Sequence, residues 1–121
     1  MLLNDFFTIS NFHTEHDLVT ASITFDKNHL IFQGHFPGNP IVPGVCMIQL
    51  VREVMEVKEK KTLRMAEGDN IKFLSVINPE QTPSVNLNIR YKFVGNSYAI
   101  DASLFLDQVT YFKFKGSFQI V

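Results

Sequence analysis

The 121-residue chain contains a single cysteine, no tryptophan, no long apolar run and no excess of charge of either sign. The lone Cys46 excludes an internal disulfide framework and any zinc site built from several cysteines. No apolar run approaches the roughly 20 residues that a membrane-spanning helix needs. The 11 basic and 12 acidic side chains give a net charge of −1, so no basic field favours nucleic acid.

Features of targeting and cofactor binding are also missing. Residues 1–5 show neither the basic start nor the apolar stretch of a signal peptide, which predicts a cytoplasmic protein. No glycine-rich phosphate loop follows a predicted strand, so a nucleotide cofactor is not expected. His13, His16 and His29 show no metal-ligand spacing with carboxylates, so we expect no metal ion.

The composition is that of a folded chain. Hydrophobic residues make up 45% and charged residues 19%, which is apolar enough to offset the entropy of ordering. At this length we expect one domain over residues 1–121. The twelve phenylalanines suit a dry core or a lined apolar tunnel, because a phenyl ring fills apolar volume without needing a hydrogen-bond partner.

Local patterns predict one long helix and several strands. We place the helix at residues 44–60, because Pro43 suits a first turn and apolar side chains cover most of the circumference, as in a helix wrapped by other elements. Alternating and β-branched segments predict strands at residues 5–13, 17–26, 62–67, 71–77, 84–94, 97–107 and 109–120. The simplest packing is an α+β hotdog fold, an antiparallel sheet wrapped around one long central helix.

The loop before the helix carries the most specific pattern in the chain. From Phe32 to Val45 it reads Phe-Gln-Gly-His-Phe-Pro-Gly-Asn-Pro-Ile-Val-Pro-Gly-Val. Through Gly-His-Phe-Pro-Gly and the later Pro-Gly at the helix entrance, it resembles the 3-hydroxyacyl-(acyl carrier protein) dehydratase family of bacterial fatty-acid synthesis. Ile71-Lys72-Phe73, followed by Asn78-Pro79, is similar to a strand and turn of the same family.

Two residues of this loop, His35 and Gly44, suggest a chemical role even without the family resemblance. His35 could exchange protons near neutral pH, or it could only hydrogen-bond a loop carbonyl. The Pro43-Gly44 step opens the helix, where the first backbone N–H groups lack intrahelical partners. A thioester carbonyl could be held on those donors as its oxygen gains charge. The alternative is that Gly44 only lets the loop pass close to the helix.

The resemblance implies dehydration of a 3-hydroxyacyl carrier-protein thioester to the trans-2-enoyl product. By that resemblance, His35 is the base that removes the C2 proton and the Gly44 amide holds the carbonyl, while Val45 and Phe36 contact the substrate. In the family, a Glu or Asp on the central helix of the other subunit acts as the acid, and the acyl chain lies in a tunnel at the dimer interface. The expected substrate is an acyl chain linked to acyl carrier protein or to coenzyme A.

The helix departs from the family pattern at the acid. Gln49 stands where the family has Glu or Asp, and Glu53 stands where it often has Gln. The two share a helix face because they are four residues apart. Gln49 can donate and accept hydrogen bonds but cannot supply a proton.

Three interpretations of this exchange remain open. In the first, Glu53 reaches the site and acts as the acid of a rearranged dyad. In the second, His35 acts as both base and acid, and Gln49 only orients the hydroxyl. In the third, the protein keeps the acyl site without the reaction, and it binds a carrier-linked acyl chain or pairs with an active dehydratase subunit. If Glu53 has no role in the reaction, we expect it to be an exposed helix residue paired with a neighbouring Lys or Arg.

Two further expectations concern assembly and competing chemistry. A chain of 121 residues has little room for a full acyl tunnel, so we expect a homodimer or a heterodimer with an active dehydratase subunit. A hotdog thioesterase using Glu53 is less favoured, because hydrolysis does not need His35. Cys46 is expected to be a small core residue, with a nucleophilic Cys46–His35 pair as the remote alternative.

Overall fold

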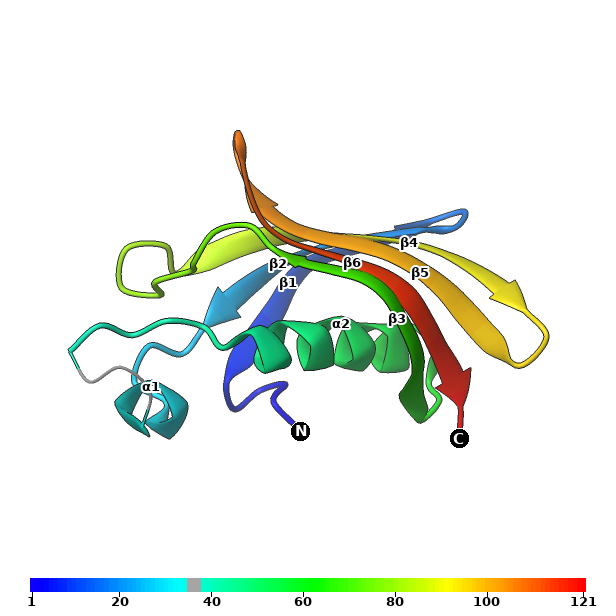
Figure 1. The fold of residues 1–121 in the computed structure, drawn as a ribbon, viewed down its shortest axis with the longest axis horizontal. Helices are drawn as coiled ribbons and strands as arrows, with labels where there is room; N and C mark the ends of the chain where they lie inside the picture. The colour runs from blue at the N-terminus through cyan, green and yellow to red at the C-terminus, as the bar shows by residue number, and fades with distance from the viewer. Residues whose placement is uncertain (35–37) are drawn as a thin grey trace.

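The computed structural model describes residues 1–34 and 38–121. Figure 1 shows one curved sheet with the long helix α2 lying along its concave side and the short helix α1 at one end. This arrangement confirms the predicted α+β hotdog fold. In chain order the elements are β1 (Phe7–Glu15), β2 (Leu18–Phe25), α1 (Leu30–Gly34), α2 (Gly44–Glu59), β3 (Leu63–Phe73), β4 (Ser84–Val94), β5 (Ser97–Leu106) and β6 (Val109–Ile120).

The strands in the described ranges form one sheet in the order β1-β2-β4-β5-β6-β3. Every neighbouring pair is antiparallel. The hairpin turns use residues at positive φ, among them His16, Gly95 and Asp107, as tight connections between twisted strands require. β3 lies at one edge of the sheet, so one side of its backbone has no partner strand among residues 1–34 and 38–121.

The structure corrects two sequence expectations. We predicted separate strands at 62–67 and 71–77, but β3 is continuous from Leu63 to Phe73. Its register shifts twice, between Met65 and Glu67 and between Gly68 and Asn70. These irregularities absorb a polar Glu-Gly-Asp-Asn segment that resembles a turn in sequence. The second difference is α1, a five-residue helix at the start of residues 29–44, for which the clustered Gly and Pro predicted an irregular loop and no helix.

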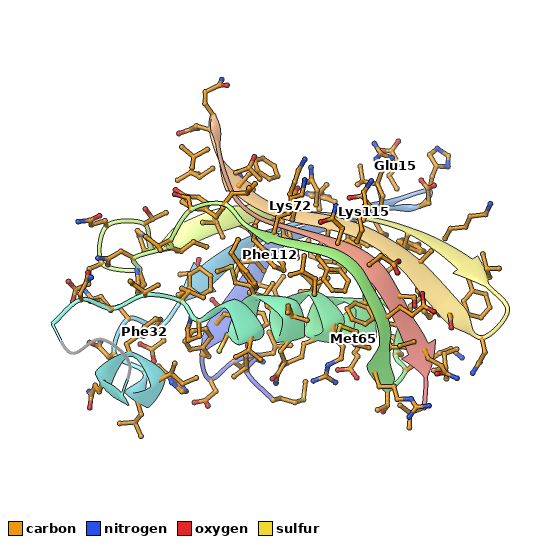
Figure 2. The ribbon with its side chains drawn as sticks, in the orientation of Figure 1. Glu15, Phe32, Met65, Lys72, Phe112 and Lys115 are labelled. Carbon is orange, nitrogen blue, oxygen red and sulfur yellow. The ribbon has the colours of Figure 1, made fainter. Side chains whose placement is uncertain are left out.

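The core lies between α2 and the inner face of the sheet. Alternate residues of β2, β4, β5 and β6 point inward and are buried, and Figure 2 shows Phe112 inside, with Lys72 and Lys115 on the opposite face. Most phenylalanines serve packing, as expected. Those that are buried are Phe6, Phe7, Phe25, Phe32, Phe112, Phe114 and Phe118.

The sheet covers α2 incompletely. Cys46, Met47 and Leu50 are buried, whereas Val45 is 71% exposed. On the side of α2 away from the sheet, Figure 1 shows the first residues of the chain crossing the helix. The predicted sheet around a central helix is confirmed for the buried face of α2, and the face that carries Val45 is left exposed by the described residues of one chain. Within residues 1–34 and 38–121, no helix is long and apolar enough to cross a bilayer.

A partly buried ion pair and a tyrosine hydrogen bond meet at the carboxyl end of α2. The Tyr98 hydroxyl donates to Glu59 Oε1 at 2.6 Å, and Lys58 Nζ donates to Glu59 Oε2 at 2.7 Å. Burial, together with the hydrogen bond to Glu59, raises the pKa of Tyr98 to about 12. The cluster thus stabilises the protonated phenol in the folded state.

This raised pKa predicts a loss of stability at high pH. A tyrosine in the unfolded chain titrates near pH 10, so between pH 10 and 12 the unfolded state loses the proton that the folded state keeps. The free energy of unfolding should therefore fall in this window by up to about 2 kcal/mol more in the wild type than in Tyr98→Phe. Urea unfolding of both proteins at pH 9, 10 and 11 measures the difference. Equal slopes against pH would contradict the prediction.

Candidate active site

The entrance of α2 presents free backbone donors. The helix begins at Gly44 after Pro43, an extended residue that provides no side-chain cap. The N–H groups of Cys46 and Met47 bond to the Pro43 carbonyl at 3.0 and 3.3 Å. No described residue accepts a hydrogen bond from the N–H of Gly44 or Val45. These two donors lie at the positive end of the helix dipole and can hold an oxygen that carries negative charge.

An apolar groove of about 460 Å³ lies beside these donors. Gly44 forms part of its wall, and the Phe73 ring packs directly on Gly44: a Cβ built there would lie 2.6 Å from Phe73 Cε1. The ring is held by stacking on Phe112, with centroids 5.3 Å apart. A side chain at position 44 would have to displace the Phe73 ring, and the contact places apolar surface next to the backbone N–H groups of Gly44 and Val45. The groove is lined by Ile41, Val42, Pro43, Gly44, Met47, Phe73, Leu74, Ser75 and Val76.

Gln49 lines a second hollow, of about 230 Å³, on the other side of Val45. Its walls include Ile48, Met65 and Val45 itself. In the part of the chain that the structure describes, Gly44 and Gln49 thus line two different hollows. His35 and Phe36, which the resemblance assigned to the base and to substrate contact, lie outside the described residues.

Glu53 is the one polar or charged side chain that is fully buried in the described part of the chain. Its Oε1 accepts the backbone N–H groups of Leu2 and Leu3 at 3.0 and 2.8 Å. Its Oε2 accepts the Leu2 N–H at 2.9 Å and Gln49 Nε2 at 2.8 Å. The interpretation of Glu53 as an exposed residue paired with Lys or Arg is wrong, because Arg52 pairs instead with Glu56 at 3.3 Å.

Sequence reasoning missed the part that Leu2 and Leu3 play in this cluster. They reach Glu53 from about fifty positions away through backbone N–H groups. Every residue except proline carries such a donor, so no side-chain pattern could have marked them. The order Gln49-x-x-x-Glu53, where the family has an acid followed by Gln, was the one sequence signal that the polar side chains on this helix face are arranged differently.

Cys46 lies on the buried face of α2, 7% exposed. Burial and the nearby Glu53 carboxylate raise the pKa of its thiol, which disfavours the thiolate that a nucleophile needs. We therefore expect native protein to react with a thiol reagent such as N-ethylmaleimide at least tenfold more slowly than urea-unfolded protein. Mass spectrometry of timed samples measures both rates, and equal rates would contradict this prediction.

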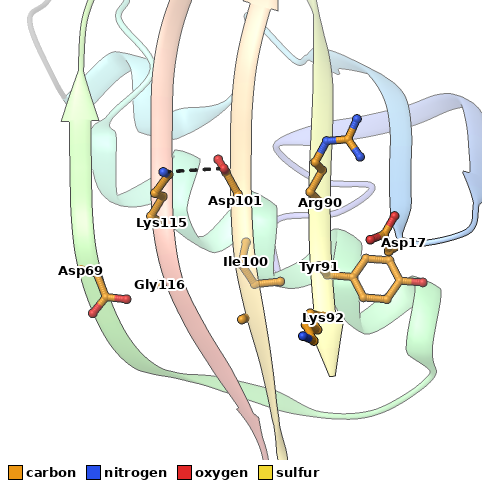
Figure 3. A pocket seen from close by; sticks show the side chains of 10 residues that line it. Asp17, Asp69, Arg90, Tyr91, Lys92, Ile100, Asp101, Lys115 and Gly116 are labelled. Carbon is orange, nitrogen blue, oxygen red and sulfur yellow. Dashed lines mark ion pairs between the residues drawn. The ribbon is translucent and has the colours of Figure 1, made fainter. Parts of the chain in front are cut away.

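A further hollow, of about 400 Å³, lies on the face of the sheet away from α2 (Figure 3). Side chains of both charges line it, including Asp17, Arg90 and Lys92. Lys115 Nζ lies 3.9 Å from Asp101 Oδ2, and both side chains are more than half exposed. None of the residues predicted for the active site lines this hollow.

Comparison with known proteins agrees with the fold and with the motif. The 3-hydroxyacyl-[acyl-carrier-protein] dehydratase FabZ of Caulobacter vibrioides is 34% identical over 90 residues, covering 74% of this chain and 52% of the relative. FabZ of Oenococcus oeni is 32% identical over 82 residues, covering 62% of this chain and 58% of the relative. The chain thus spans about half the length of the curated relatives it matches.

Solved structures share the fold at low sequence identity. The dehydratase heterocomplex ApeI:P from Xenorhabdus doucetiae matches with a TM-score of 0.74 at 20% identity, over 92% of this chain and 96% of that one. Conserved protein PA5202 from Pseudomonas aeruginosa matches with a TM-score of 0.64 at 12% identity, over 91% of this chain and 86% of that one. The sequence model of the ApeI-like protein family, described as ApeI dehydratase, matches residues 11–114 of this chain. Since this match spans most of the chain, the protein belongs to the ApeI-like dehydratase family.

Proposed function

We propose that this protein dehydrates 3-hydroxyacyl thioesters carried on acyl carrier protein, giving trans-2-enoyl thioesters. The observation that carries the proposal is the entrance of α2. There, the free N–H groups of Gly44 and Val45 lie beside an apolar groove, so a thioester carbonyl and its acyl chain can be held together. The relatives named FabZ are 3-hydroxyacyl-[acyl-carrier-protein] dehydratases, and this similarity supports the same reaction.

The reaction needs a base at C2, donors at the carbonyl and a proton for the leaving hydroxyl. Donors on the carbonyl oxygen stabilise the enolate that forms as the C2 proton leaves. We assign the base to His35, which then returns the proton to the C3 hydroxyl, so that water departs and the C2–C3 double bond forms. Gln49 orients that hydroxyl. Glu53 is a poor candidate for the acid, because the groups that contact its carboxylate are all hydrogen-bond donors.

The working unit in this proposal is a dimer that pairs through β3. The exposed apolar side chains that border this edge strand are Val45, Met65, Phe73, Leu74 and Val76. An uncovered apolar edge of this kind normally meets another chain. Because Gly44 and Gln49 line separate hollows within one chain, we assign each complete site to parts of two subunits. Coenzyme A as an alternative carrier, and the cytoplasmic location, stay predictions from the sequence.

A second candidate function is favoured by the absence of a proton donor at Gln49. In a homodimer both sites would contain Gln49, whereas a different partner chain could supply the missing acid. The similarity in fold to a chain of a dehydratase heterocomplex supports this candidate. The protein would then contribute the carbonyl donors and His35 to a heterodimer with an active dehydratase subunit.

Turnover of a short 3-hydroxyacyl carrier protein by the purified chain tests these candidates. Enoyl product formed by the chain alone would support the homodimeric dehydratase, and light scattering would give its oligomeric state. Enoyl product that appears only with a second dehydratase subunit would support the heterodimer. Released thiol without enoyl product would identify a thioesterase. No product under either condition would overturn the proposed dehydration.

A further inference from the structure

The carboxylate of Glu53 leaves the Gln49 amide one permitted orientation. Glu53 Oε2 accepts a hydrogen bond from Gln49 Nε2 at 2.8 Å and another from the Leu2 N–H at 2.9 Å. The NH₂ group of Gln49 must therefore face Glu53, which turns the carbonyl oxygen Oε1 the other way.

The opposite end of the amide is open. No described residue donates a hydrogen bond to Gln49 Oε1, yet no buried side-chain oxygen or nitrogen in the described part of the chain lacks a partner. Oε1 is therefore accessible, and Gln49 lines the hollow bounded by Val45 and Met65. The side chain presents a hydrogen-bond acceptor to whatever enters.

Glu53 itself is held in place from the other side. The N–H groups of Leu2 and Leu3 bond to its carboxylate, and residue 53 lies one helical turn beyond residue 49. The side chain is fully buried, so it cannot rotate to another partner without losing all of these bonds. The backbone at residues 2 and 3 therefore fixes the Glu53 side chain, and Glu53 in turn fixes the orientation of the Gln49 amide.

We propose that Glu53 is a positioning residue, which fixes Gln49 with its oxygen toward the substrate and so selects a C3 substituent that donates a hydrogen bond. This inference rests on the proposed function, because that function places the substrate's C3 group at Gln49. A 3-hydroxyacyl chain can donate to Oε1. A 3-oxoacyl chain offers only an acceptor, and two acceptors facing each other leave both without a hydrogen-bond partner.

The variant Glu53→Gln should reverse this selection. Its Oε1 would keep the bonds from Leu2 and Leu3, so its NH₂ would face Gln49 and force that amide to turn over. Gln49 would then present NH₂, a donor that a 3-oxo group accepts. In the double variant Gln49→Glu with Glu53→Gln, the new NH₂ donates to the new carboxylate, and the remaining oxygen still accepts from Leu2 and Leu3. Only the second bond from the Leu2 N–H, to Oε2, is lost, and an acceptor again faces the hollow.

Calorimetric binding of two amide analogues tests the proposal. Both replace the thioester sulfur of an acyl-pantetheine with NH to resist turnover, and they differ only in a 3-hydroxyl or a 3-oxo group. We expect wild type and the double variant to prefer the 3-hydroxyl analogue about tenfold, and Glu53→Gln to lose or invert that preference. An unchanged preference in Glu53→Gln would overturn the positioning role. If Glu53→Gln does not fold, a double variant that prefers the 3-oxo analogue would overturn it.

A second readout needs no substrate. Amide hydrogen exchange by ¹⁵N NMR should show the Gln49 NH₂ protected about tenfold relative to that of Gln81, which is exposed. Protection of Gln49 without binding of either analogue would leave the Glu53–Gln49 bond in place and overturn the proposed acyl site. Binding of the analogues with an unprotected Gln49 would overturn the positioning role alone.

Discussion

Glutamate introduced alone at position 49 should destabilise the protein by about 2–4 kcal/mol at pH 7. In the wild type, Gln49 Nε2 donates to Glu53 Oε2 at 2.8 Å. The change would place a second carboxylate in contact with that of Glu53, whose side chain is fully buried. They must share a proton or repel, and either outcome costs free energy relative to the present hydrogen bond.

The exchanged pair, Gln49→Glu with Glu53→Gln, should recover most of this loss. The new glutamine can accept from Leu2 and Leu3 through its oxygen and donate to the new glutamate through its NH₂. We expect the free energy of unfolding of the double variant to lie within about 1 kcal/mol of the wild-type value. The two positions should therefore show a coupling free energy of a few kcal/mol. This double variant also places an acid where the resemblance to the dehydratase family expects one.

Urea unfolding of the wild type, both single variants and the double variant completes the cycle. Gln81→Glu is a matched control, since that side chain is exposed and should tolerate the same change within about 0.5 kcal/mol. A single variant as stable as wild type at pH 7 would show that the two side chains do not meet.

Alanine at position 35 should abolish most of the proposed dehydration, lowering kcat by about 10²–10⁴. The effect should lie at the large end of this range, since His35 is proposed to act as both base and acid. Binding of the 3-hydroxyacyl amide analogue should change little, because the Gly44 and Val45 amides and the apolar groove stay in place. The loss should therefore fall on kcat and leave the affinity nearly unchanged.

The assay follows enoyl formation from a 3-hydroxyacyl carrier protein. His13→Ala is the matched control, because His13 is exposed on β1 and takes no part in the proposed site. Wild-type turnover that persists in His35→Ala would exclude His35 as the base. If Glu53→Gln lowered kcat by a similar factor while keeping the preference for the 3-hydroxyl analogue, the rearranged dyad with Glu53 as acid would replace our assignment.

The sequence by itself determined the elements whose patterns are local. The helix was expected at 44–60 and is Gly44–Glu59, while the strands expected at 84–94 and 109–120 are β4 and β6. Periodicity and turn residues carry such information because each side chain must face either the core or solvent. The Pro43-Gly44 step also predicted a helix entrance with unpaired backbone donors, because the first N–H groups of a helix lack intrahelical partners, and the role of Gly44 in holding a carbonyl stays a prediction.

Only the tertiary structure decided how Glu53 is used. A glutamate four residues after a glutamine on a helix can be exposed, paired or buried, and nothing local separates these cases. Burial followed because the backbone at Leu2 and Leu3 crosses α2 and supplies donors. The continuity of β3 was decided in the same way, since pairing with β6 along its length outweighs a segment that resembles a turn. Both outcomes depend on hydrogen bonds between distant backbone segments, which side-chain identity does not encode.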